Sequence, residues 1–251
     1  QLPVVHVVAR GSQVAASLQS SSIRGLDAGG IDLTAATAAA SQTQEISGVV
    51  IPEGVGQTEG EEYDDVEPGV RVYAPHADEA TVTVTVTKNG EGAQPPQVLT
   101  LVDGVVAEAM LGALEPGEYS IRVDADVPVV AAARTTIRDG DTSEYAWVVA
   151  GQSLSEQTAV AVPAGVDARL HVLNPSTEAV EVTVVDRRGD ERTLHIDPAD
   201  QQTVRLGSDA DYQLIGSGII ASVSTVSDDG IASFPVHPAT AGEQALTVYP
   251  H

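Results

Sequence analysis

The sequence has no cysteine, one lysine, one methionine, one tryptophan and one phenylalanine in 251 residues. Without cysteine the chain can form neither a disulfide framework nor a thiolate metal site. No apolar run approaches the roughly 18 residues that cross a bilayer, so we expect no membrane insertion. The only methionine is Met110 and residue 1 is Gln. We therefore expect a fragment of a longer protein, with any signal peptide or anchor outside this sequence.

Positive charge is also scarce. The chain carries 36 acidic and 12 basic residues, a formal net charge of −24. Nucleic acid and anionic membrane surfaces repel such a chain, so we predict neither as a partner. Two interpretations of the acidic residues stay open. They are solvated turns that keep the protein soluble, or they bind divalent cations or cationic partners.

Common hydrolase motifs are missing from the sequence. It contains no Gly-x-Ser-x-Gly, its single lysine Lys88 completes no Ser-x-x-Lys, and its histidines never form His-x-x-x-His. His171 and His195 can be interpreted as a metal pair that meets across strands, or as ordinary strand residues. We predict a non-enzymatic protein that needs no cofactor.

Short alternating segments dominate what the sequence does contain. Residues 71–86 align without gaps on residues 169–184, and in each segment valine alternates with Thr or Glu. This period of two is typical of an antiparallel strand with one face on a core and one in water. Turns rich in Gly, Asn, Asp and Pro separate the segments. The pattern predicts an all-β fold of tandem immunoglobulin-like antiparallel β-sandwich units.

The repeats suggest four sections of the chain. We predict a partial β unit at 1–55, an acidic linker or loop at 56–69, and β-sandwich units at 70–165 and 166–251. The first section matches only the second half of a unit, with residues 4–8 as the counterpart of residues 119–123. Either the leading half lies upstream of Gln1, or the true folding unit straddles the repeat boundary and borrows strands from residues 70–110.

Two aromatic residues mark the repeat. Trp147 and Phe234 each stand ten residues before a matching glutamine, Gln157 and Gln244. Each glutamine opens a segment that closes in proline, at residues 157–163 and 244–250. Because apolar residues flank both aromatics, we predict that both are core anchors. The alternative is a carbohydrate-binding platform.

The candidate metal ligands are Asp139, Asp141 and Glu144. They begin like a calcium loop, with carboxylates at alternate positions, but lack the glycine and the distal Glu of an EF-hand. The alternative is a solvated turn. A separate tripeptide, residues 188–190, spells the integrin-binding Arg-Gly-Asp, although Gly-Asp is also what a tight hairpin turn favours.

Five short motifs recur along the units. They read Leu170-His-Val-Leu-Asn174-Pro175, Glu118-Tyr119-Ser-Ile121, Pro128-Val-Val-Ala131, Ala146-Trp147 and Ala161-Val162-Pro163. This pattern resembles an actinobacterial family of secreted or membrane-anchored envelope proteins of uncharacterised function. The resemblance implies an extracytoplasmic location and repeated β-sandwich units, and it supplies no catalytic residues.

The residues that the repeats share are core and turn residues, which favours a structural role. We therefore expect an extracytoplasmic spacer or protein-interaction module of the cell envelope, with an unknown protein or cell-wall partner. The alternative is an adhesion module that binds Ca²⁺ or glycan.

Overall fold

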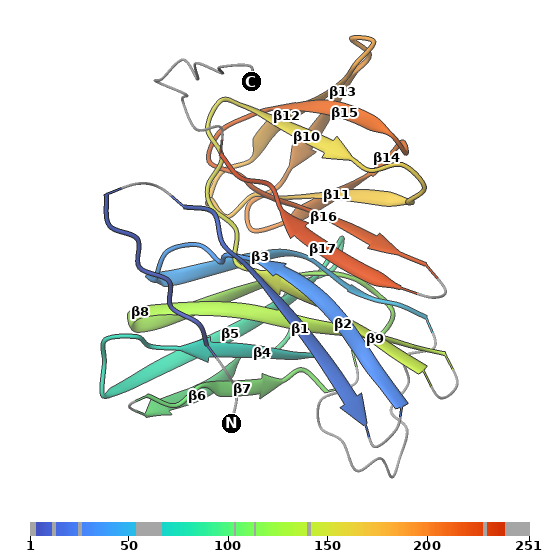
Figure 1. Ribbon diagram of the computed structural model, residues 1–251. Helices are drawn as coiled ribbons and strands as arrows, with labels where there is room; N and C mark the ends of the chain where they lie inside the picture. Colours follow the sequence, from blue (N-terminus) through green and yellow to red (C-terminus); the bar gives the residue numbers. More distant parts are fainter. Residues whose placement is uncertain are drawn as a thin grey trace.

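The computed structural model describes residues 4–11, 14–24, 27–53, 67–102, 104–112, 114–139, 142–227 and 230–238. Antiparallel strands and turns make up this part of the chain, and the prediction of an all-β fold is confirmed. Two stacked groups of sheets are visible, one built from the middle of the chain and one from its C-terminal third (Figure 1). In these ranges no helix has the length and apolar character to cross a bilayer.

The valine alternation forms strands as expected. In β5 (Glu79–Lys88) the valine side chains are at most 5% exposed, whereas the threonines between them reach solvent. Its repeat β12 (Val180–Asp186) buries Val182 and Val184 in the same way. Successive strand residues point to opposite faces, so this pattern places one face of each strand on a core.

Two layers form the first sandwich. One layer has the strand order β3-β8-β5-β6, and the other has the order β9-β8-β4-β7. Strand β8 belongs to both layers, because residues near Val123 pair with β3 and β5 and residues near Ala131 pair with β4. The bounds are β3 (Ser41–Ile51), β4 (Gly69–Tyr73), β6 (Gln97–Val102), β7 (Ala107–Met110), β8 (Gly117–Asp139) and β9 (Thr142–Val149).

The second sandwich repeats this arrangement. Its layers have the orders β10-β15-β12-β13 and β17-β16-β11-β14. Strands β15 and β16 together correspond to β8, and β10 occupies the place that β3 has in the first sandwich. The bounds are β10 (Gln157–Val162), β11 (Ala168–Leu173), β13 (Glu191–Ile196), β14 (Gln201–Leu206), β15 (Ala210–Ile215), β16 (Ile220–Val226) and β17 (Ile231–Pro235).

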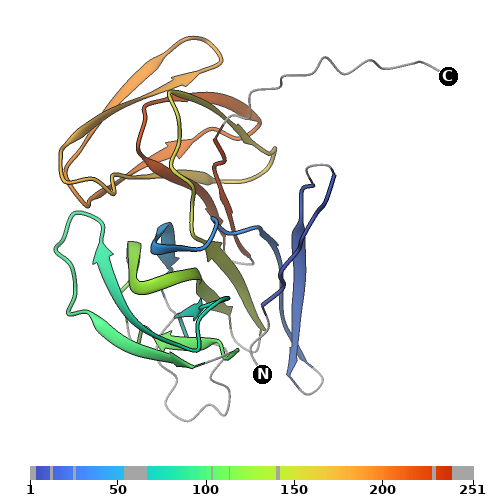
Figure 2. The same cartoon turned by 90° about the vertical axis from the view of Figure 1, so that its left-hand side faces the viewer.

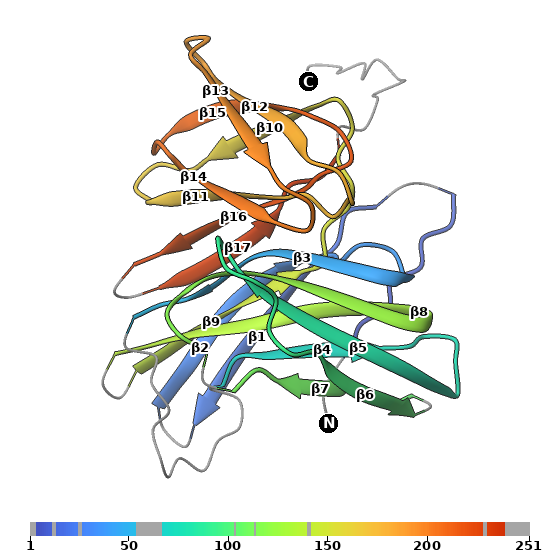
Figure 3. The same ribbon diagram turned by 180° about the vertical axis from the view of Figure 1, so that it is seen from behind.

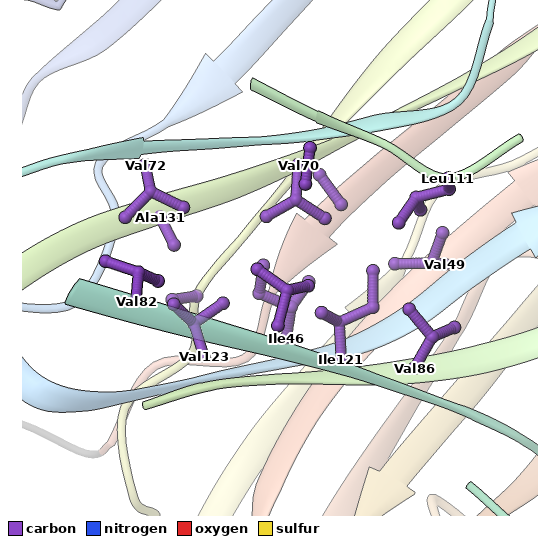
Figure 4. Close-up of a cluster of buried hydrophobic side chains, with 14 of the residues drawn as sticks. Ile46, Val49, Val70, Val72, Val82, Val86, Leu111, Ile121, Val123 and Ala131 are labelled. Carbon is purple, nitrogen blue, oxygen red and sulfur yellow. The ribbon is translucent and has the colours of Figure 1, made fainter. Parts of the chain in front are cut away.

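The strand pairing moves the boundaries of the folding units. Strand β10 lies within the predicted unit 70–165, yet it pairs with β15 in the second sandwich. Likewise β3 lies within the predicted partial unit 1–55 and pairs with β8. Ile46 and Val49 of β3 lie in the first core beside Val70 and Val123 (Figure 4). By pairing, β3 therefore belongs with the first sandwich and β10 with the second, and we call these two the boundary strands.

A separate hairpin precedes the first sandwich. Strands β1 (Ser17–Arg24) and β2 (Asp27–Ala35) pair only with each other among the described residues. The hairpin stands beside the first sandwich (Figure 2). It matches the last hairpin of each sandwich, formed by β9 with the end of β8 and by β17 with β16. The predicted acidic section 56–69 lies largely outside the described residues.

The boundary shift predicts which sandwich responds to a change in β10. Val160 is 3% exposed and lies in the second core. Replacing Val160 with Ala should cost about 1 to 3 kcal/mol of unfolding free energy because it leaves a cavity. Amide hydrogen exchange should accelerate in β12 and β15 but not in β5. Ala161→Ser, on the exposed face of the same strand, is the control; acceleration in β5 instead would contradict the pairing.

Candidate interaction groove and the junction between the sandwiches

Boundary strand β3 joins the two sandwiches. It lies between them, below β11 and β16 (Figure 3). Ser47 donates a hydrogen bond from Oγ to Ser222 Oγ at 3.1 Å, and Ser222 Oγ donates to the Ser47 carbonyl at 2.8 Å. The Gly48 amide donates to Gln201 Oε1 at 2.9 Å. These groups are buried, so the junction replaces water by specific partners.

His171 of β11 lies at the centre of the junction and is completely buried. Its Nε2 lies 2.7 Å from Ser224 Oγ and its Nδ1 lies 3.1 Å from Thr203 Oγ1. Burial lowers the pKa of His171 to about 4, although the nearby Glu118 carboxylate raises it and Arg169 lowers it further. The imidazole is therefore neutral near pH 7, and the junction holds no buried imidazolium.

Glu118 of β8 links the first sandwich to this histidine. Its carboxylate accepts hydrogen bonds from Thr203 and, at 2.6 Å, from Arg169 Nη1. Burial raises the pKa of Glu118, but these hydrogen bonds outweigh burial and hold the pKa below its usual value. Because the Thr203 hydroxyl donates to Glu118, it accepts from His171 Nδ1–H, which leaves Nε2 to accept from Ser224. The network thus uses a single histidine tautomer.

The junction contains the residue types of a serine hydrolase triad, namely Ser224, His171 and Glu118, but their placement does not suit catalysis. The serine is 2% exposed and the histidine is fully buried, so the hydroxyl faces the opposing sandwich and no substrate can approach it. Thr203 stands between the histidine and the acid. The alternative metal pair of His171 with His195 is not formed, because the two lie in different sheets and His195 pairs with Glu181.

A groove of about 210 Å³ opens on the outer face of the first sandwich, under the β1–β2 hairpin. We call it the N-terminal groove. Mostly apolar side chains form its walls, which are Val4, Val5, Leu18, Ser20, Thr34, Thr37, Arg71, Val72, Tyr73, Val106, Val130, Ala131, Ala132, Trp147 and Val149. Sequence reasoning missed this groove, since its walls come from segments more than a hundred residues apart.

Trp147 lines the groove and is not a core anchor. It pairs with Arg134, on the face opposite to the buried Ala133. Phe234 instead pairs with Val223, and it packs on the second core. The side chains of Trp147 and Phe234 therefore point to opposite faces of their sheets, because the pairing differs by one residue and such a shift turns a strand side chain to the other face. The prediction holds for Phe234 and is wrong for Trp147.

Two arginines cover the indole. The Cζ atom of Arg71 lies 4.4 Å from the ring centroid of Trp147, and that of Arg134 lies 5.7 Å from it. Glu108 holds both guanidinium groups, with a contact of 3.3 Å to Arg71 and one of 3.1 Å to Arg134. Cation–π contact and ion pairing thus fix the ring in the groove wall. The indole face has an occupant already, which weakens its use as a stacking platform for sugars.

The candidate metal ligands are not brought together in the described part of the chain. Asp141 and the Asp139 side chain lie outside it. The carboxylate of Glu144 accepts a hydrogen bond from the Ile31 amide at 3.0 Å, so it helps to hold β2 against β9. Among the described residues, no three His, Cys, Asp or Glu side chains are arranged to hold a metal ion.

The Arg-Gly-Asp tripeptide lies at the exposed tip between β12 and β13. The Asp186 carboxylate accepts hydrogen bonds from the amides of Arg188 and Asp190 at 2.8 and 2.9 Å. Gly189 has φ +86°, which favours glycine. These contacts account for the tripeptide as a tight hairpin turn.

Residues 1–207 match a family described as a family of unknown function, DUF5719. The chain belongs to the DUF5719 family. No curated protein matches it. The match spans the β1–β2 hairpin, the first sandwich and most of the second, so the stacked arrangement falls within one family region.

The junction of this DUF5719 chain predicts an effect at Gly48. A Cβ added there would lie 2.6 Å from the His171 ring, and the residue has φ +74°. At Gly90, with φ +73°, a Cβ would meet nothing within 4 Å. Gly90→Ala should cost about 1 to 2 kcal/mol through backbone strain alone. Gly48→Ala should cost about 1 to 3 kcal/mol more, because it also overpacks the junction. Denaturant unfolding measures both; equal losses would contradict the buried contact.

His171 predicts a dependence of stability on pH. Its folded pKa of about 4 lies below the ordinary 6.5, so between these values the unfolded chain binds more protons and stability falls as pH falls. Relative to His171→Gln, the wild-type chain should lose up to about 3 kcal/mol of unfolding free energy between pH 7.5 and 4. Burial raises the pKa of Glu45 to about 7, although Arg122 lowers it. Glu45 makes stability rise as pH falls, which is the opposite effect, but it is present in both proteins and so does not change their difference. If the difference in unfolding free energy between the wild-type chain and His171→Gln stayed constant over this pH range, that result would contradict a neutral buried histidine.

Proposed function

We propose that this DUF5719 chain is a non-enzymatic β-sandwich repeat protein outside the cytoplasm that acts as a structural spacer or protein-interaction module of the cell envelope. The extracytoplasmic location rests on the resemblance of the repeat motifs. Its partner is an unknown protein or a component of the cell wall.

The buried junction is the observation that carries the spacer function. Every residue of β3 from Gln44 to Ile51 is buried, although sandwich strands with one free face alternate between buried and exposed positions. One face of β3 therefore lies in the first core and the other contacts the second sandwich. Such a shared strand fixes the angle between two units better than a flexible linker does. A stack with fixed angles holds a set distance, which is what a spacer requires.

Chemistry at the junction also supports a non-enzymatic role. The only hydrolase-like group on the described part of the chain is the set Ser224, His171 and Glu118, whose serine and histidine are closed off from solvent. Its side chains have a structural use, since they satisfy one another across the junction.

A glycan- or Ca²⁺-binding adhesion module is the second candidate. Trp147 in the N-terminal groove favours it, because indoles bind apolar faces of ligands. Against it, the Arg71 guanidinium covers the ring, and Glu144 is engaged with β2. Retention of the chain in a glycan pull-down, or a rise of its melting temperature with calcium, would favour this candidate over the spacer.

A distance measurement tests the spacer function. The chain has no native cysteine, so Thr81→Cys on β5 and Thr193→Cys on β13, both at exposed positions, give one spin label on each sandwich. Pulsed electron paramagnetic resonance should find a single narrow distance distribution. The same pair in Gly48→Ala should give a broader one, because the junction is overpacked.

Two results would contradict the proposal. One is a broad distribution in the unchanged junction, which would mean that the sandwiches move independently. The other is hydrolase turnover by the intact chain that disappears in Ser224→Ala, with Ser176→Ala as an exposed-serine control.

A further inference from the structure

The turn after β5 places an asparagine at the junction of the two sandwiches. Asn89 directly follows Lys88, the last residue of β5. Its backbone amide donates to the Glu118 carbonyl at 2.8 Å, and its side-chain Nδ2 donates to Thr203 Oγ1 at 3.2 Å. The same Nδ2 lies 3.4 Å from Glu118 Oε2. The Asn89 side chain therefore contacts β14 of the second sandwich and the carboxylate that belongs to the His171 network.

The residue after Asn89 is Gly90, and in an Asn-Gly pair the backbone nitrogen readily attacks the side-chain amide. The attack closes a succinimide ring between the Gly90 nitrogen and Asn89 Cγ, and glycine has no Cβ to obstruct it. Gly90 has φ +73°, and a Cβ built on it would meet nothing within 4 Å. Residues 90–92 are all exposed. The turn thus leaves open space around the attacking nitrogen and lets water reach the ring.

Hydrogen bonding leaves the reacting groups available as well. The Glu91 amide closes the turn by donating to the Lys88 carbonyl at 2.9 Å, and the Gly90 amide donates to no acceptor among the described residues. The contacts of Asn89 Nδ2, at 3.2 and 3.4 Å, are long for N–H···O hydrogen bonds. Neither the attacking nitrogen nor the leaving amino group is therefore fixed by a short hydrogen bond.

The other asparagine of the chain differs in each of these respects. The sequence contains two asparagines, Asn89 and Asn174. Asn174 is completely buried, and its Nδ2 donates to the backbone carbonyls of two neighbouring segments. The residue after it is Pro175, whose nitrogen carries no proton and cannot form the ring. The chain therefore contains its own unreactive reference for any chemistry at Asn89.

We propose that Asn89 is a deamidation site whose product loosens the junction between the sandwiches. The Gly90 nitrogen bonds to Asn89 Cγ and loses its proton, the bond from Cγ to Nδ2 breaks, and ammonia leaves. Water then opens the succinimide at either of its carbonyls, which gives aspartate or isoaspartate. The net reaction consumes water and releases ammonia, and it needs no other reactant. This goes beyond the spacer role, and the chemical step does not depend on that role.

The product cannot make the contacts that the asparagine makes. Nδ2 is a donor to Glu118 and Thr203, and a carboxylate oxygen in its place can only accept. The new carboxylate faces the Glu118 carboxylate, so repulsion replaces attraction at the junction. The Thr203 hydroxyl cannot offset this repulsion, because its proton already goes to Glu118. An isoaspartate also lengthens the backbone of the turn by a CH2 group, which displaces the side chain further.

Mass spectrometry of the full chain tests the chemical step. Deamidation replaces NH2 by OH, a gain of about 1 Da. Incubation at mildly alkaline pH should produce this gain, and peptide mapping should place it at Asn89 and not at Asn174. The reference rate is that of a peptide of residues 85–95, and the chain should react within about tenfold of it. Asn89→Gln should show no gain, because its longer side chain would have to close a larger ring.

The spin-labelled pair Thr81→Cys and Thr193→Cys tests the consequence. Asn89→Asp reproduces the aspartate product, and it should broaden the distance distribution between the two sandwiches. Gln94→Glu is the matched control, because it makes the same change from amide to carboxylate at an exposed position of the same loop. It should leave the distribution as narrow as that of the unchanged junction.

Two results would overturn the proposal. One is a reaction at Asn89 that is more than about tenfold slower than in the peptide, which would mean that the fold protects the turn. The other is a distribution in Asn89→Asp that is as narrow as in Gln94→Glu. Neither result bears on the spacer function, which the unchanged junction tests. The mass measurement also stands if that junction gives a broad distribution.

Discussion

The pairing of each boundary strand with a central strand is the interaction on which the rest of the fold depends. Strand β3 pairs with β8, and β10 pairs with β15. Without these pairs one layer of each sandwich would lack a strand, and the core would be open to water on that edge. Because β3 is also covered on its outer face, the same strand closes one core and joins it to the next unit. Gly48 permits this, since it has no Cβ to collide with the His171 ring and it adopts a positive φ without strain.

The two boundary strands show what the neighbouring unit contributes. Strand β3 is buried on both faces, and β10 alternates between exposed and buried positions. Their places within their own sandwiches are equivalent. The difference lies outside the sandwich, because the second unit covers β3 and no described unit covers β10. Burial in such a stack is therefore a property of neighbours as well as of sequence.

Sequence alone predicted the strands, and it predicted their partners less well. Alternation at Val82 and Val182 identifies strands and faces, because the side-chain period is local. Repeats do not state which strands pair, and β10, which lies in the predicted unit 70–165, pairs with β15 of the second sandwich. Trp147 was misplaced because its spacing to Gln157 matched that of Phe234 to Gln244, whereas pairing within each hairpin sets the face. The junction around His171 and the N-terminal groove join distant segments, and no local pattern reports such contacts.

Cross-strand proton contacts would test the central claim most directly. In an antiparallel pair the α-protons come close at every second pair of facing residues, the pairs without mutual hydrogen bonds, and nuclear Overhauser effects detect them. The boundary-strand account predicts such contacts at alternate pairs of β10 and β15, in the register that sets Thr158 opposite Leu214 and Ala159 opposite Gln213. It also predicts none between β10 and β8. Contacts from β10 to β8, with β15 left unpaired on that edge, would contradict the account and return β10 to the first sandwich.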